Sequence, residues 1–223
     1  DNTCVKNGEM PGTADLSGRI ARANANTAHR YIPLAAGAGT LRWLEHALVT
    51  GRLADGTFKL RGDLARFPFP NPADGDFRIA GRVTGATLDV LPGAPGDDGR
   101  PAAPGAVWPV LSEIDADLLF ERASMTITAQ RARAYGARIE NATARIPHLG
   151  HEATLDVRGT ASGPLAEMLR YVNTSPVKAW IGGVTEGAEA QGNVKLDLGL
   201  VIPLARADSV KVTGALAFQK GLG

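Results

Sequence analysis

The sequence predicts a mainly β protein, built as a long antiparallel meander that two short helices interrupt. Three observations predict this class: apolar and polar residues alternate over most of the 223 residues, aromatic residues make up only 5%, and the chain holds 27 Gly and 14 Pro. Such a balance favours short strands joined by turns over a helical bundle. Turn signals recur about every eight to twelve residues, a spacing typical of sandwiches, barrels and open rolled sheets.

The N-terminal quarter is predicted to hold one strand and one helix. Residues 13–31 read as a strand followed by a polar connection. Three leucines recur at helical spacing from Leu41 to Leu48, and Gly51 follows as a stop signal. This spacing predicts a short amphipathic helix near 40–50, which must dock on another element.

After the helix the period of the apolar residues changes to two. The stretch "GTFKLRGDL" alternates, the proline-rich "FPFPNPADG" interrupts it, and "DFRIAGRVTGATLDVLPG" resumes the alternation. Proline cannot sit inside a central strand, so the interruption is a turn or loop. Residues 93–106 are rich in Gly and Pro and poor in apolar residues, which predicts a flexible loop insertion.

The remaining sequence is predicted to form more strands and a second helix. Three strands are expected at Ile114–Phe120, Ser124–Arg131 and Ala137–Ile146, and "ATLDVRGTAS" forms another. A helix near 164–173 is expected because Leu165, Met168, Leu169 and Val172 share one face, Pro164 suits a first turn and Pro176 ends it. The segments "AQGNVKLDLGLVIPL" and "DSVKVTGALAF" return to strands, and the last could find its pairing partner in chain beyond residue 223. The residues 1–223 are therefore expected to form one β-rich segment of a larger protein.

Composition excludes several classes of function. The formal net charge is only +1 and the arginines are scattered, which argues against nucleic acid as a partner. No apolar run reaches the roughly 20 residues of a membrane span. Cys4 is the single cysteine, so it forms no intramolecular disulfide and no cysteine-based zinc site.

The sequence holds no recognisable catalytic motif, so we expect no enzyme, no cofactor and no metal site. His148 and His151 form an H-x-x-H pair without a third and fourth ligand, which is typical of a solvated turn. Glu113, Asp115 and Asp117 lie on one face at strand spacing, but the aromatic residues that stack a sugar in glycosidases are missing around them. They read as a solvated face of the strand.

Four arginines fall in the same region and occur on both strand parities: Arg131, Arg133, Arg138 and Arg145. We interpret them as solubilising groups on a sheet with one wet face, which also protect its edges from aggregation. Attraction to an anionic lipid headgroup is the alternative.

Several phrases, in order, resemble one known family. They are "RYIPL", "WLEHALVTGRLADGTFKLRGDLARFPF", "FRIAGRVTGATLDVLPG", "WPVLSEIDADLLFERASMTI", "ARIPHLGHEATLDVRGTASGPLAEMLRYVNTSPV" and "GNVKLDLGLVIPL". Together they resemble the YhdP family of large AsmA-like envelope proteins of Gram-negative bacteria, and the likeness runs from about Asp15 to Phe218. The main departure is the 93–106 insertion between "VLPG" and "WP".

The resemblance implies a non-enzymatic role in phospholipid transport between the inner and outer membranes. Such proteins are anchored in the inner membrane by an N-terminal helix and extend across the periplasm, so this chain would be a periplasmic segment without the anchor. Their bodies are an elongated, curled, taco-like open sheet whose concave face is apolar. The partners implied are phospholipid acyl chains, neighbouring segments of the same full-length chain and other envelope proteins.

An apolar groove in a curled sheet would bind acyl chains without any directional contact, at about 0.8 kcal/mol per buried CH₂. Nine residues are candidates to line it: Leu118, Phe120, Met125, Ile127, Leu155, Val157, Leu196, Leu198 and Leu200.

Two alternatives stay open. The same alternation would fill the core of a closed sandwich, giving a structural or protein-interaction module without lipid. A carbohydrate-active protein that works through Asp115 and Asp117 is the weakest reading.

Overall fold

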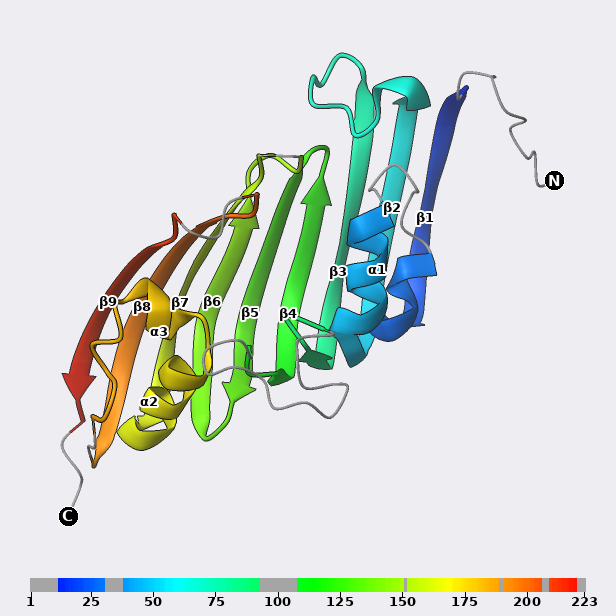
Figure 1. Cartoon of the computed structure of the whole chain (residues 1–223). Helices are drawn as coiled ribbons and strands as arrows, with labels where there is room; N and C mark the ends of the chain where they lie inside the picture. Colours follow the sequence, from blue (N-terminus) through cyan, green and yellow to red (C-terminus); the bar gives the residue numbers. More distant parts are fainter. Residues whose placement is uncertain are drawn as a thin grey trace.

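The computed structural model describes residues 12–30, 38–92, 108–150, 152–188, 191–205 and 209–219. All strands of this part of the chain belong to one antiparallel sheet of nine strands, which follow one another in chain order from β1 at one edge to β9 at the other (Figure 1). The prediction of a mainly β, antiparallel, open sheet is confirmed. The expected loop at 93–106 lies outside the described residues.

The strands vary from eight to sixteen residues in length. Their bounds are β1 Thr13–Asn24, β2 Leu48–Asp63, β3 Gly75–Leu88, β4 Leu111–Glu121, β5 Ser124–Ala134, β6 Ala137–Ile146, β7 Thr154–Pro164, β8 Asn193–Pro203 and β9 Lys211–Phe218. Strands β4 and β5 run three residues further than expected, to Leu111 and to Ala134. The prediction fell short there because both strands are irregular near these ends.

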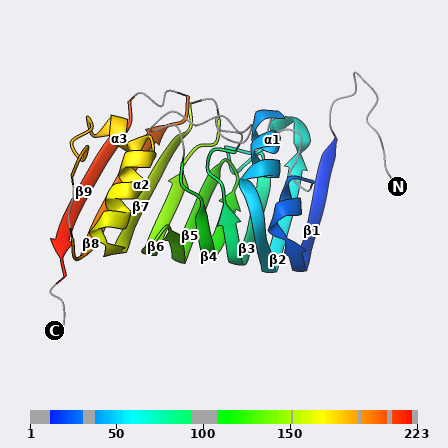
Figure 2. The ribbon, with the colours of Figure 1, turned by 60° about the horizontal axis from the view of Figure 1, so that its bottom comes forward.

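Short helices connect some of the strands. They are η1 (Ala25–Arg30), α1 (Ala38–Ala47), η3 (Leu64–Arg66), α2 (Leu165–Thr174) and α3 (Val177–Trp180). Helix α1 stops at Ala47 because Val49 and Thr50 are β-branched and favour the strand that begins at Leu48. Helices α1 and α2 lie over the same end of the sheet, the end at which β7 leads into α2 and α1 leads into β2 (Figure 2). We call it the helix end, and the opposite one the far end.

Pairing between the strands separates apolar and polar side chains onto two faces. Leu16 pairs with Leu60, Leu60 with Phe77, and Ile79 with Phe120, so apolar residues of β1–β4 point to the same side. The pairing continues in the same way to β9, where Leu216 lies opposite Leu196. The result is one apolar face and one polar face that both extend across all nine strands, as period-two alternation requires.

Bulges keep the two faces separate where the sequence loses its strict alternation. Asp55, Glu113 and Asn141 have φ angles of 52°, 50° and 50°, and the register shifts beside each of them. An extra residue in the left-handed region turns the following side chains back to their original face. Arg138 and Arg145 flank Asn141 and therefore both lie on the polar face, although their sequence parity differs.

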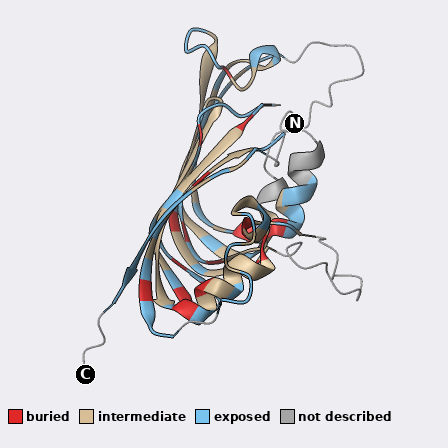
Figure 3. Cartoon of the chain, turned by 60° about the vertical axis from the view of Figure 1, so that its left-hand side comes forward, coloured by how far each residue is buried: buried red, intermediate tan, exposed pale blue. Residues whose placement is uncertain are grey.

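The buried core lies between the apolar face and the helices at the helix end. Leu165 and Met168 of α2 pack against Ala137 of β6 and Val194 of β8. The part of the sheet beneath α2 carries small side chains such as Ala137, which let the helix backbone come close to the sheet. Figure 3 shows the sheet in profile, bent, with the helices on the inner side of the bend and many of the buried positions beside them.

Trp108 lies just before β4, a strand in the middle of the sheet, and packs against helix α3. Its ring centroid lies 5.6 Å from that of Trp180 in α3. Burial raises the pKa of the Tyr171 hydroxyl to about 12, and the neighbouring Trp108 indole offsets this only in part. The aromatic partner of Trp108 therefore comes from the second helical region.

Candidate functional site

All nine candidate residues lie on the apolar face. Leu118 is paired with Ile127 and Phe120 with Met125, which brings β4 and β5 together. On the other side of β6, Leu155, Val157 and Ala161 of β7 pair with even-numbered residues of β8, which places Leu196, Leu198 and Leu200 on this face.

Strand β6 joins these two groups and was missing from the predicted set. Ala144 pairs with both Ile127 and Val157, and Ile146 pairs with Met125. The alternation in "ARIENATARI" carries the signal for these residues, but the bulge at Asn141 shifts its parity halfway. With β6 included, the apolar face is continuous from β4 to β8.

The burial of the candidate residues divides the face into two parts. Leu200 is buried at 5% exposure, and the other eight are half-buried. Leu196 packs against the cluster formed with α2, so it belongs to the covered helix end. Phe120 and Met125 pair next to the β4–β5 turn, at the far end of the sheet. Helices α1, α2 and α3 are drawn at the opposite, helix end in Figures 1 and 2.

The described strands form no second sheet that could close over this face, since all nine lie in a single sheet. A two-sheet sandwich core is therefore not the arrangement of the described residues. Two surface hollows of about 440 and 180 Å³ lie at the helix end of the sheet, and neither is lined by any of the nine candidates.

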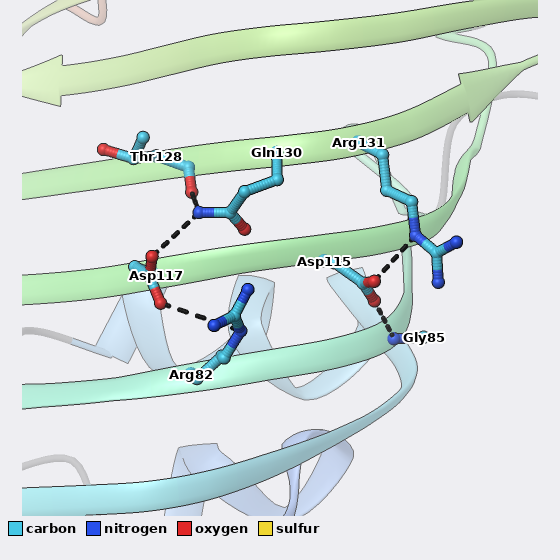
Figure 4. Close-up of polar contacts among 7 residues, drawn as sticks. All are labelled: Arg82, Gly85, Asp115, Asp117, Thr128, Gln130 and Arg131. Atoms are coloured by element: carbon cyan, nitrogen blue, oxygen red, sulfur yellow. Dashed lines mark hydrogen bonds and ion pairs between the residues drawn. The ribbon is translucent and has the colours of Figure 1, made fainter.

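The polar face carries the acids that raised the question of catalysis (Figure 4). Asp115 accepts hydrogen bonds from the Arg131 guanidinium at 2.7 Å and from the Gly85 backbone N–H at 2.9 Å. Asp117 accepts one from the Gln130 amide at 2.8 Å and lies 4.0 Å from the Arg82 guanidinium. Both carboxylates are thus engaged in links between neighbouring strands.

Glu113 completes this pattern through its ion pair with Arg133, at 2.9 Å. Because all three acids pair with cations or amide donors on adjacent strands, they serve as cross-strand ties on the wet face of the sheet. The arrangement matches the solvated-face interpretation of these residues and offers no pair of free carboxylates across a cleft.

Asp115 is expected to stabilise the bulge at Gly85. Hydrogen bonds, first from the Gly85 N–H and then from Arg131, hold the pKa of the Asp115 carboxyl below its usual range, and the side chain is only 19% exposed. Asp115→Asn should lower the free energy of unfolding by about 1–2 kcal/mol at neutral pH.

The pH dependence follows from the lowered pKa in the folded state. The stabilising contribution is present above the unfolded pKa of about 4 and is lost as the pH falls through the lowered folded value. Urea unfolding of the wild type and of Asp115→Asn should therefore differ most above about pH 5 and converge in more acidic solution. A constant difference at all pH values would contradict this role.

Other groups offer little chemistry in the described part of the chain. His148 is exposed, and His151 lies outside the described residues. Among the described residues there is no group of three or more His, Cys, Asp or Glu side chains placed to hold a metal ion. None of the described helices is long and apolar enough to cross a membrane.

Comparison with known proteins agrees with the ordered phrases of the sequence. The chain is 24% identical over 197 residues to the intermembrane phospholipid transporter YhdP of Escherichia coli (strain K12), an alignment that covers 88% of this chain. It spans only 14% of that relative's length. No solved structure matches the chain. The model of the family described as YhdP protein matches residues 3–222, nearly the whole chain, so the chain belongs to the YhdP family.

Proposed function

We propose that this chain is a non-enzymatic segment of an intermembrane phospholipid transporter and that the apolar face of its sheet holds acyl chains. The observation that carries the proposal is the continuous apolar face across β4–β8, which stays half-buried toward the far end. A contiguous apolar surface that stays partly exposed is unusual in a soluble protein unless something binds to it.

The chemistry of the face suits a hydrocarbon ligand. Its side chains are Leu, Ile, Val, Met, Phe and Ala, while the charged groups of these strands occupy the opposite side. Each buried CH₂ contributes about 0.8 kcal/mol without a directional contact, so a chain can slide along such a surface. A site that conducts lipid needs neither a nucleophile nor a metal, which fits the relative named as a transporter.

The open edges suggest how the segment joins the rest of its transporter. Strands β1 and β9 each pair on one side only among the described strands. On β9 the apolar face ends in Leu216 and Phe218, which are 47% and 69% exposed. Since the relative is about seven times longer than the matched segment, neighbouring segments of the same polypeptide are the proposed partners at both edges.

In this proposal the sheet curls into a taco-like trough that continues through successive segments. The bend drawn in Figure 3, with the helices on its inner side, supports this proposal, because α2 packs on the apolar face. The segment would lie in the periplasm, with the inner-membrane anchor elsewhere in the full-length protein, and phospholipid would pass toward the outer membrane. Other envelope proteins are the further partners in this proposal.

The test compares two adjacent leucines that lie on opposite faces of β4. Leu118 is on the apolar face opposite Ile127, whereas Leu119 is on the polar face opposite Thr126. Phospholipid should be extracted from the purified wild-type chain and from Leu119→Asp, and native mass spectrometry should find it bound. Leu118→Asp should lose it, and so should Leu155→Asp and Leu198→Asp, because a charge on the apolar face makes burial of a hydrocarbon unfavourable.

Circular dichroism and unfolding curves establish that the variants are folded. Absence of lipid from the wild type would remove the proposal of direct conduction and leave a structural module. Equal lipid loss from Leu118→Asp and Leu119→Asp would place binding elsewhere than on the apolar face.

A further inference from the structure

The polar face has an uneven distribution of charge at the helix end. Near this end one row of paired residues, here called the basic row, runs across β4–β8 as Ser112, Arg133, Arg138, Ser162 and Lys195. This row contains three cations and no acid.

The next row toward the far end is acidic instead, with three acids and one cation. It runs through Asp115, Arg131, Glu140, Thr160 and Asp197, so acids alternate with neutral or basic partners. The contrast shows that the excess of positive charge is local to the basic row and is not a property of the whole face.

The pair Arg133 and Arg138 is the most unusual part of the row. The two residues lie directly opposite each other on β5 and β6. Like charges in that position destabilise a sheet unless a counter-charge lies between or beside them. Glu113 neutralises Arg133, at 2.9 Å, but no hydrogen bond or ion pair within the described chain satisfies Arg138.

Lys195, like Arg138, has no hydrogen bond or ion pair with any of the described residues. Ser162 lies between these two cations, paired with Arg138 on one side and with Lys195 on the other. The nearby Asp197 accepts a hydrogen bond from Thr160 at 2.7 Å. Among the described residues, the row therefore presents two cations without a counter-charge, one on each side of the Ser162 hydroxyl.

A surface hollow of about 180 Å³ opens at this point of the sheet. Arg133, Arg138, Ser162, Asn193 and Gln219 line it together with backbone at Gly136, Gly163 and Pro164, and no carboxylate is among the lining residues. Its volume lies below the roughly 300–1,000 Å³ of sites for drug-sized ligands, so it suits a small group and not a whole lipid.

We propose that this hollow binds an oxyanion, specifically a phosphate group. A guanidinium presents paired N–H donors that match two phosphate oxygens, and the Ser162 hydroxyl and the Asn193 and Gln219 amides supply neutral donors around the rest of the group. Bound phosphate would also supply the counter-charge that Arg138 lacks. The phosphate could belong to a lipid headgroup at a membrane surface or to a soluble phosphate ester.

This site is independent of the proposed conduction of lipid. The hollow lies on the polar face, on the opposite side of the sheet from Leu118 and Leu155. Loss of phosphate binding should leave lipid on the apolar face, and loss of lipid should leave phosphate binding, so the two failures are distinguishable.

The experiment titrates the ¹⁵N-labelled 223-residue chain with inorganic phosphate, with chloride at matched ionic strength as the reference. Saturable shifts are expected at the Arg138 side chain and at the Ser162 and Gly163 amides. Arg138→Gln should weaken phosphate binding by about ten-fold or more, the usual scale for loss of a charge-assisted hydrogen bond. The matched control is Arg145→Gln, on the same strand and face but in a row with Asp156, and it should bind as the wild type does.

Thermal unfolding gives a second readout that a purely structural role would not produce. Phosphate should raise the midpoint of the wild type and of Arg145→Gln but not that of Arg138→Gln. Absence of saturable shifts, the same shifts with chloride, or undiminished binding by Arg138→Gln would overturn the proposal.

Two further arms distinguish the sources of the phosphate group. Flotation with vesicles of phosphatidylcholine and phosphatidylglycerol, dependent on Arg138, would identify a lipid headgroup. Saturable binding of sn-glycerol 3-phosphate without flotation would identify a soluble ester. Vesicle binding that Arg138→Gln leaves intact would contradict any role of the hollow in it.

Discussion

Replacing Phe69 by alanine is expected to lower the free energy of unfolding by about 3–5 kcal/mol, as for other fully buried aromatic residues. Phe69 is 0% exposed, although it lies in the proline-rich connection between β2 and β3. Its ring rests on Gly62 and Gly75, which pair with each other, and a Cβ at Gly75 would come within 2.8 Å of it. Phe67 adds an edge contact, with ring centroids 5.9 Å apart.

The loss of unfolding free energy should be large because the cavity that Phe69→Ala leaves cannot close. The glycines beneath the ring have no side chains that could move into the space, and Gly62 has a φ of 137° that other residues rarely adopt. The matched control is Phe218→Ala, which removes the same atoms from a residue that is 69% exposed and should cost less than about 0.5 kcal/mol. Denaturant unfolding of both variants measures the difference, and similar losses would show that Phe69 does not anchor this connection.

The two faces of the sheet could be predicted from sequence because a strand has a period of two. Phe58 and Leu60, or Leu118 and Phe120, appear on one side wherever the strand is regular. The helix near 164–173 could also be predicted from sequence, since Leu165 and Met168 are spaced for one face of a helix. Both residues are buried in the structure. These features depend on local spacing alone.

Features that depend on bulges or on distant partners could not be predicted. The left-handed residues Glu113 and Asn141 reset the parity of their strands, and no strict local signal marks such positions. The burial of Phe69 depends on two glycines brought together by pairing of β2 and β3. The packing of Trp108 on Trp180 joins residues that are far apart in the chain.

The basic row beside the small hollow could not be predicted for the same reason. Arg133 and Arg138 were seen in the sequence, but only the register places them opposite each other and next to Ser162. Lys195 comes from a strand after the second helix, so spacing along the chain could not connect it to them.

The sharpest difference between the two faces is expected on strand β7, where they alternate along a few residues. Leu155 and Val157 point to the apolar face and pair with Ile202 and Leu200. Asp156 and Arg158 point to the polar face and form an ion pair at 3.1 Å. A ligand on the apolar face would contact the first two residues and would be screened by the sheet from the other two.

The measurement is site-specific photocrosslinking in cells that express the full-length protein. A photoreactive amino acid replaces Leu155, Val157, Asp156 or Arg158 in turn, and phospholipid adducts are quantified after irradiation. The account predicts adducts at Leu155 and Val157 that exceed those at Asp156 and Arg158 by about ten-fold or more, since two buried methylenes at about 0.8 kcal/mol each already correspond to that factor. Equal labelling of both pairs of positions, or no phospholipid adduct at Leu155 and Val157, would contradict it.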